Sequence, residues 1–193
     1  PYKSEVMLLL PKLYGEFRLG YNKTIKDKND ISLLLVGSLR SETNTEVTSI
    51  QESLPKRNIS TAGRFTYGYD SRYFFEANFG YNGSERFSEN NRFGFFPSVG
   101  MGWMISNEHF MQVLQDKLTR FKIRATYGLV GNDQIGYNRD RFFYLSQIDM
   151  NSGGYTFGTD RGYTRPGVLI RRYANNLITW EIARKFNLGI EMT

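Results

Sequence analysis

The sequence has no cysteine and only one histidine, His109, among its 193 residues. Without cysteine there can be no disulfides, thiolate nucleophiles or zinc–thiolate sites. One histidine excludes a two-histidine metal site and leaves little room for a Ser/His/Asp triad. No spacing singles out a pair of carboxylates for glycoside cleavage. We therefore expect no catalytic residue, no metal site and no cofactor.

Long hydrophobic runs are also missing. The longest candidates, Val6–Leu10 and Leu33–Val36, span five and four residues, whereas a membrane-spanning helix needs about 18 to 20 apolar residues. Helical spans are thereby excluded, but membrane strands of alternating polarity are not. The formal net charge is +6, and no basic run interleaves with a nucleic-acid motif, so nucleic acid is not an expected partner.

Aromatic residues and glycine are abundant, which favours strands over helices. The chain has 15 Phe, 13 Tyr, 2 Trp and 19 Gly, a composition typical of β-proteins. From Asn58 to Asn82 apolar side chains occupy mainly odd positions and polar ones even positions, which is the period of a strand. The aromatic faces of both strands share one side of a hairpin only if paired residue numbers sum to an even value, as in Tyr69 opposite Tyr73. The loop then has an odd number of residues, most simply the three residues 70–72.

The same alternation predicts five further strands and an all-β, antiparallel up-and-down fold. They are Leu13–Asn22, Ser32–Arg40, Phe93–Ile105, Phe121–Leu129 and Lys185–Met192. Strands of about 11 to 13 residues reach about 36 to 43 Å, enough to cross a bilayer core when tilted. Compact and long connections alternate, as they do in membrane barrels, and 131–185 is predicted to be one long connection. Seven strands cannot close a barrel, so we predict a segment of a larger transmembrane β-barrel.

One connection, 107–116, departs from this alternation of compact and long loops. Phe110, Val113 and Leu114 stand at helical spacing there and predict one short amphipathic helix. The alternative is an irregular loop.

Several motifs occur in one order between residues 58 and 193. They read YNGSERF (81–87), NRFGFFPS (91–98), GWMIS (102–106), LTRFKIRATYG (118–128), GND (131–133), ITWE (178–181) and KFNLG (185–189). With them the chain resembles the SusC family (SusC/RagA-like) of TonB-dependent outer-membrane transporters of Bacteroidetes. Residues 1–57 resemble it only weakly. The family's Arg-Tyr-Asp-Gly-Ser pattern reads Gly-Tyr-Asn-Gly-Ser at 80–84, so no role of that acid is carried over.

The resemblance implies that residues 1–193 are part of one transmembrane barrel of about 22 strands, from its middle-to-late part. The plug and the TonB-interacting segment would lie outside this chain. The implied function is import of an oligosaccharide or peptide across the bacterial outer membrane. Implied partners are membrane lipid, the remaining barrel and plug, TonB and a SusD-like surface lipoprotein. The residues alone leave open a soluble β-rich carbohydrate-binding or adhesin module and a passive porin.

Two sets of site residues follow from the strand faces. Facing the lumen or plug we expect Arg64, Glu76, Asn78, Arg120, Lys122 and Arg124. Facing lipid, or in the interfacial aromatic girdle, we expect Tyr67, Tyr69, Tyr73, Phe75, Phe79, Tyr81, Trp103 and Tyr127. The tyrosines could instead stack on sugars. The three β-strand cations at 120–124 could hold the plug, attract an anionic solute or pair with carboxylates such as Glu76.

Two further groups of polar residues are candidates for a functional role. A set of polar residues in the long connection could ligate a hard cation, although such clusters are more often turn chemistry. They are Asn132, Asp133, Asp140 and Asp149. His109 is expected to be an exposed polar residue.

Overall fold

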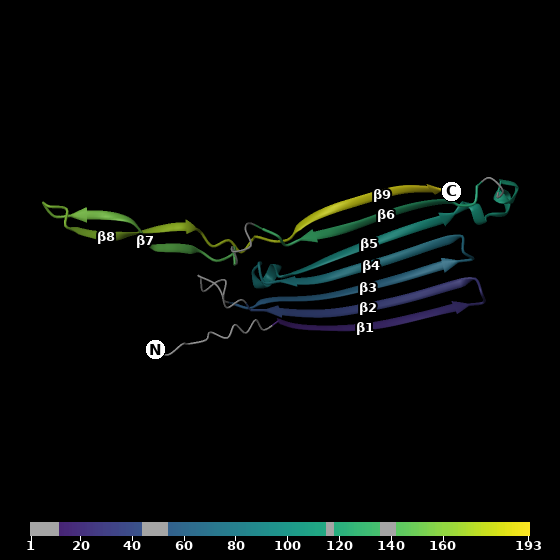
Figure 1. Cartoon of the computed structure of the whole chain (residues 1–193), viewed down its shortest axis with the longest axis horizontal. Coiled ribbons are helices and arrows are strands. Elements are labelled where there is room, and N and C mark those ends of the chain that lie inside the picture. Colours follow the sequence, from purple (N-terminus) through teal and green to yellow (C-terminus); the bar gives the residue numbers. More distant parts are fainter. Residues whose placement is uncertain (1–11, 44–53, 115–117, 136–141) are drawn as a thin grey trace, which may run out of the picture.

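The computed structural model describes residues 12–43, 54–114, 118–135 and 142–193. Seven strands form one antiparallel sheet in the order β1-β2-β3-β4-β5-β6-β9 (Figure 1). Their bounds are β1 Lys12–Ile25, β2 Asn29–Glu42, β3 Lys56–Tyr69, β4 Tyr73–Ser84, β5 Phe93–Met104, β6 Phe121–Asn132 and β9 Glu181–Met192. All seven predicted strands are present, and the up-and-down antiparallel fold is confirmed.

The register of the β3–β4 hairpin is the one predicted. Tyr69 lies opposite Tyr73 and Tyr67 opposite Phe75, which leaves a loop of three residues. Asp70 and Ser71 adopt positive φ angles of 51° and 53°, a left-handed conformation that short polar residues tolerate in turns.

The connections sort to the two ends of the sheet, as expected (Figure 1). Residues 26–28, 70–72 and the β5–β6 connection lie at one end, which we call the short-turn rim. The strand ends that are joined by 43–55, 85–92 and 133–180 lie at the other end, the long-loop rim. The 85–92 connection contains a short 3-10 helix, η1 (Glu89–Asn91).

The prediction of one amphipathic helix over 107–116 is wrong in form. Two 3-10 helices occupy this connection, η2 (Ile105–Asn107) and η3 (His109–Leu114). They are separated at Glu108, whose backbone is extended with φ −80° and ψ 146°. Phe110 is exposed rather than packed. The side chains of Val113 and Leu114, and all of Asp116, lie outside the described part.

The prediction of a single long connection over 131–185 also needs correction, because part of it is a second sheet. β7 (Gln147–Phe157) and β8 (Tyr163–Arg172) form an antiparallel hairpin, which extends from the long-loop rim in Figure 1. Its pairing contains register shifts around Asp149, Ser152 and Tyr155. Such irregularities interrupt the polar–apolar alternation on which strand prediction depends.

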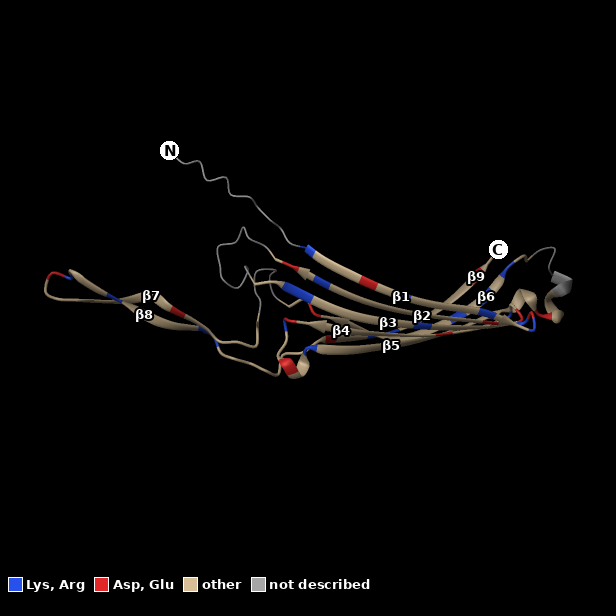
Figure 2. Ribbon diagram, turned by 90° about the horizontal axis from the view of Figure 1, so that it is seen from below, with Lys and Arg blue, Asp and Glu red and all other residues tan. Residues whose placement is uncertain are grey.

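The seven-stranded sheet curves into a trough with β1 and β9 at its edges (Figure 2). Buried hydrophobic side chains are few: among the described residues the core cluster is Phe87, Phe96 and Trp180, at the long-loop rim. Most large apolar side chains of the sheet are exposed. No helix within the described ranges is long and apolar enough to span a membrane.

Candidate functional site: a two-faced wall and its rims

Register divides the sheet into two chemically different faces. Odd positions of β1 to β6 lie opposite odd positions, and odd positions of β6 lie opposite even positions of β9. We call the side that bears the odd residues of β1 to β6 the apolar face and the opposite side the polar face. Since neighbouring side chains in a strand point to opposite sides, every strand contributes to both.

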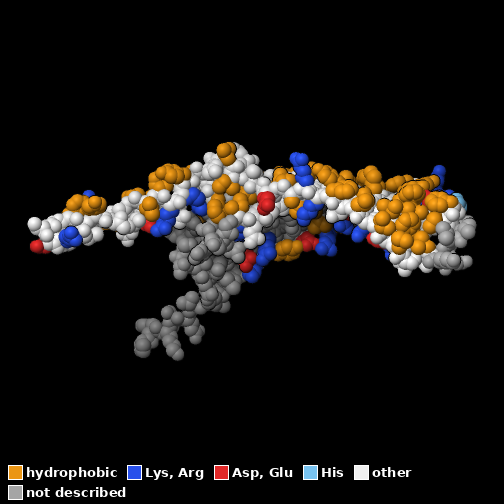
Figure 3. Space-filling model, turned by 90° about the horizontal axis from the view of Figure 1, so that it is seen from above, with side chains coloured by type: hydrophobic (Ala, Val, Ile, Leu, Met, Phe, Trp, Pro, Cys, Tyr) orange, Lys and Arg blue, Asp and Glu red, His pale blue; other side chains and the backbone are white. Residues whose placement is uncertain are grey.

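All eight residues predicted to face lipid lie on the apolar face, where rings contact across strands. Tyr69, Tyr73 and Trp103 form a row near the short-turn rim, with ring centroids 6.5 and 6.4 Å apart. Farther along, Phe79 lies 5.9 Å from Phe95, and Tyr81 lies 5.2 Å from Phe93. Figure 3 shows hydrophobic side chains gathered at the short-turn rim and along the β7–β8 hairpin.

The polar face carries Arg64, Glu76 and Asn78, which the sequence assigned to one face, and the structure brings them into contact. The Arg64 Nε donates to Asn78 Oδ1 at 3.0 Å and lies 3.5 Å from Glu76 Oε1. The Asn78 amide donates to the same Glu76 carboxylate at 2.7 Å. The three side chains therefore bond to one another, and Arg64 and Asn78 share the Glu76 carboxylate.

The three cations of the β6 side also lie on the polar face, but they do not meet Glu76. Arg120 and Arg124 both pair with Glu191 of β9, at 3.2 and 3.4 Å. Lys122 lies over the ring of Phe74, 5.3 Å from its centroid. Two of the three cations, Arg120 and Arg124, therefore form ion pairs across neighbouring strands. Their partner is Glu191, which the sequence did not single out.

The polar face lines the trough. A hollow of about 800 Å³ is lined by residues from all seven strands of the sheet. Its polar-face lining includes Asn22, Ser32, Thr66, Glu76, Asn78, Ser98, Lys122, Arg124, Thr126 and Asn187. The arrangement provides a polar, hydrogen-bonding surface on one side of the sheet and a hydrophobic surface on the other.

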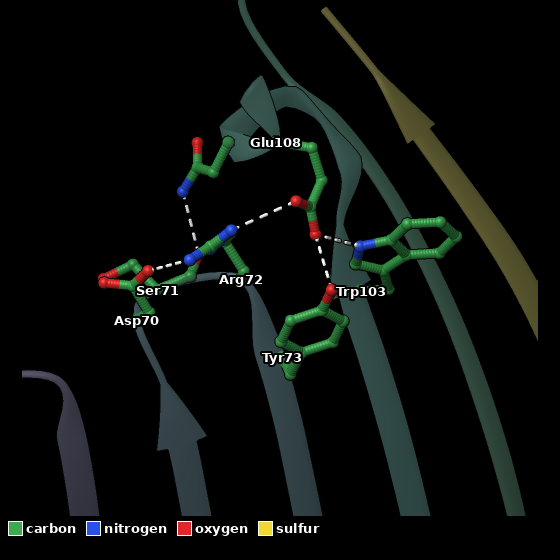
Figure 4. Close-up of polar contacts among 7 residues, drawn as sticks. Asp70, Ser71, Arg72, Tyr73, Trp103 and Glu108 are labelled. Atoms are coloured by element: carbon green, nitrogen blue, oxygen red, sulfur yellow. Dashed lines mark hydrogen bonds and ion pairs between the residues drawn. The ribbon is translucent and has the colours of Figure 1, made fainter. Parts of the chain in front are cut away.

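A polar cluster at the short-turn rim joins two connections (Figure 4). The Glu108 carboxylate accepts hydrogen bonds from Tyr73 Oη at 2.7 Å, Trp103 Nε1 at 3.0 Å and Arg72 Nη1 at 3.1 Å. Arg72 also pairs with Asp70. Sequence reasoning missed Glu108, because nothing in its neighbourhood indicates that its side chain reaches two aromatic residues of the apolar face.

Hydrogen bonds lower the pKa values of both acids in this cluster, Glu108 and Asp70. Those from Tyr73 and Trp103, and then that from Arg72, hold the pKa of Glu108 below its usual value. The hydrogen bond from Arg72 likewise lowers the pKa of Asp70. Both carboxylates are therefore stabilised in their charged form, and the cluster holds the β3–β4 turn against the β5–β6 connection.

At the long-loop rim an aromatic cluster anchors both ends of the 133–180 connection. Phe87 and Phe96 each lie 5.2 Å from Trp180, ring centre to ring centre. Ser84 donates to Asp133 at 2.7 Å, and Asn91 donates to the carbonyl of Asn176 at 2.9 Å. The β7–β8 hairpin thus begins and ends at fixed points of the wall.

The described residues of the proposed cation set have other partners. Asp133 accepts from Ser84, and Asp149 pairs with Arg171 at 2.6 Å. Asn132 donates to Glu181 and accepts from the Gln134 amide. Asp140 lies outside the described residues. His109 is exposed, as predicted.

Comparisons with known proteins agree with this architecture. No protein-family model matches the chain. It is 34% identical over 136 residues to the TonB-dependent receptor SusC of Bacteroides thetaiotaomicron, which covers 69% of this chain and 13% of that protein. It is 27% identical over 197 aligned positions to the TonB-dependent receptor P39 of Formosa agariphila, covering 90% of this chain and 18% of that protein.

Among solved structures, the chain is similar to the RagAB peptide importer in its closed-closed state, with a TM-score of 0.69 at 21% identity. That match covers 94% of this chain and 21% of the other. The fold is therefore a segment of an up-and-down antiparallel β-barrel. The chain belongs to the SusC-like family of TonB-dependent receptors. It spans less than a fifth of the length of the curated relatives it matches.

Proposed function

We propose that this chain is a stretch of barrel wall in a TonB-dependent nutrient importer of the bacterial outer membrane. The single observation that carries the proposal is the division of one continuous sheet into a hydrophobic face and a hydrated, trough-lining face. A water-soluble sandwich would cover the hydrophobic face with a second sheet. A barrel wall leaves that face to lipid and turns the polar face toward the lumen.

In this proposal the residue sets have distinct roles. The aromatic set from Tyr67 to Tyr127 contacts lipid, and Tyr69, Tyr73 and Trp103 form part of an interfacial girdle near one rim. Arg64, Glu76, Asn78, Arg120, Lys122 and Arg124 face the lumen or the plug. The short-turn rim is periplasmic and the long-loop rim extracellular, as in bacterial barrels with short periplasmic turns.

The free edges of β1 and β9 support the same proposal. Each presents a row of backbone groups that lipid cannot satisfy, so within a membrane both edges must pair with further strands. In the proposed protein the remaining barrel supplies those strands. The relatives span far more residues than this chain, which is consistent with such neighbours.

The cargo and partners follow by analogy with the relatives. The RagAB structures are described as a peptide importer, and SusC is a TonB-dependent receptor. We infer import of an oligosaccharide or a peptide, energised through TonB and assisted by a SusD-like surface lipoprotein. The long-loop rim is where such a lipoprotein would sit.

The test is uptake by cells that carry or lack the full-length protein. Cells are supplied with labelled oligosaccharides and peptides in parallel, with and without TonB. The proposal predicts that deletion abolishes uptake of one cargo class and that loss of TonB has the same effect. Uptake that persists without TonB would indicate a passive pore, and unchanged uptake of both classes after deletion would refute an import role.

A further inference from the structure

Phe74 is an aromatic residue on the polar face, where its neighbours on β4 are Glu76 and Asn78. It lies between two glycines, Gly68 on β3 and Gly102 on β5, which are its direct partners across the sheet. A methyl group at Gly68 would lie 3.7 Å from ring atom Cδ1, and one at Gly102 would lie 3.8 Å from Cδ2. Because both partners lack side chains, neither covers the ring, and Phe74 is 36% exposed.

Lys122 supplies a cation at the same place. Its Nζ lies 5.3 Å from the centre of the Phe74 ring, within the range of a cation–π contact. Among the described residues no carboxylate lies within ion-pairing distance of Lys122, in contrast to Arg120 and Arg124, which share Glu191. The charge of Lys122 is therefore available to an anion above the ring.

The surrounding trough carries an excess of positive charge. On the polar face its lining includes Lys122, Arg124 and Lys185, against Asp30 and Glu76. Arg124 already pairs with Glu191 and Glu76 with Arg64, which leaves Lys122 and Lys185 against Asp30. A concave surface with an excess of one sign of charge attracts ions of the opposite sign.

We propose that Phe74 and Lys122 form a lumenal subsite for a carboxylate-bearing part of the cargo, in which the carboxylate meets Lys122 and the adjoining apolar face stacks on Phe74. This rests on the proposed import function and deepens it by assigning an anionic cargo. Uronic acids and acidic amino-acid side chains both present a carboxylate beside an apolar face.

An acidic segment of the plug is the competing occupant. The structure favours cargo over the plug, because Glu191 already pairs with Arg120 and Arg124. These two arginines therefore do not need carboxylates from the plug. Among the described residues Lys122 is left without a carboxylate partner, beside the partly exposed ring of Phe74. Such a spot suits a small group better than a broad protein surface.

The test measures binding to the purified full-length transporter in detergent by calorimetry. Two matched probe pairs are used: a tri-uronate with its neutral trisaccharide, and a glutamate-containing tripeptide with its glutamine analogue. We expect wild type to bind the acidic member of one pair more tightly, and the identity of that pair indicates the source of the carboxylate. Lys122→Gln should weaken acidic binding about tenfold and leave neutral binding unchanged.

Three further variants make the result specific. Lys122→Arg should retain the acidic preference, and Phe74→Ala should weaken both members of the bound pair. Arg184→Gln is the matched control, because Arg184 is a β9 cation opposite Leu129, on the apolar face, and it should change nothing.

The proposal is overturned if wild type prefers neither acidic probe, or if Lys122→Gln behaves like the Arg184→Gln control. It is also overturned if Lys122→Gln raises single-channel leak without altering the preference, which would assign Lys122 to the plug. A failure of this kind leaves TonB-dependent uptake intact, so it is distinguishable from failure of the proposed import function.

Discussion

The aromatic cluster at the long-loop rim should control how tightly the extracellular connections are held. Phe87 is fully buried and contacts Trp180, which in turn contacts Phe96. Replacing a buried Phe by Ala typically costs about 3 to 5 kcal/mol, through lost transfer free energy and the cavity that remains. We take the lower end, about 3 kcal/mol, because a cluster at a rim can partly collapse into the space.

The corresponding increase in local opening is more than about 100-fold, since each 1.4 kcal/mol is a factor of ten. Hydrogen–deuterium exchange of the full-length protein reports it directly. The reporters are the Ser84 amide, which donates to Arg92 O at 2.9 Å, and the Asn91 amide, which donates to Ser88 O at 3.0 Å. Both should exchange much faster in Phe87→Ala.

Phe110→Ala is the control, because Phe110 is 65% exposed and lies at the opposite rim. Exchange at Ser84 and Asn91 should be unchanged in that variant. An increase of less than about tenfold in Phe87→Ala, equivalent to about 1.4 kcal/mol, would refute the inference that this cluster anchors the rim.

Three further predictions follow from the same contacts. A methyl group at Gly131 would lie 1.9 Å from Phe96 Cζ, so Gly131→Ala should displace the ring and lower the free energy of unfolding by about 1 to 3 kcal/mol. It should also accelerate exchange at the Ser84 and Asn91 amides. Gly37→Ala is the control, because a methyl group there would have nothing within 4 Å. Glu108 has a lowered pKa, so its stabilisation is complete above the unfolded-state value near 4.3 and is lost as the pH falls through the lower folded value. Trp103 fluorescence in a Trp180→Phe background should therefore change only below about pH 4, and a Glu108→Gln variant that retained the transition would contradict this. Expressed alone, the chain should yield no detergent-free monomer, because its apolar face and both sheet edges are uncovered; a monodisperse, cooperatively melting monomer would refute this.

The sheet could be predicted from sequence because its signal is local. Alternation along each strand is set by the two faces of a wall, and the number of residues between Tyr69 and Tyr73 fixes the hairpin register. The two faces of the site followed from the same rule. Arg64, Glu76 and Asn78 are therefore on one side and the eight aromatic residues on the other, as expected.

The partners of the charged residues could not be predicted in this way. Glu191 pairs with Arg120 and Arg124 through the β6–β9 register, and those strands are separated in sequence by the whole 133–180 connection. The β7–β8 hairpin was missed because register shifts break its alternation. Glu108 was missed because it separates two 3-10 helices that the apolar spacing had suggested were one helix.

The central claim is that the polar face meets water and the apolar face meets lipid. Spin labels placed singly at positions 64, 65, 75 and 76 of the full-length protein in a bilayer test it most directly, because each strand of the hairpin then carries one label on each face of the sheet. We predict that labels at 65 and 75 are accessible to oxygen dissolved in lipid, and that labels at 64 and 76 are accessible to a water-soluble relaxing agent. The reverse pattern, with 64 and 76 accessible from lipid, would contradict the account.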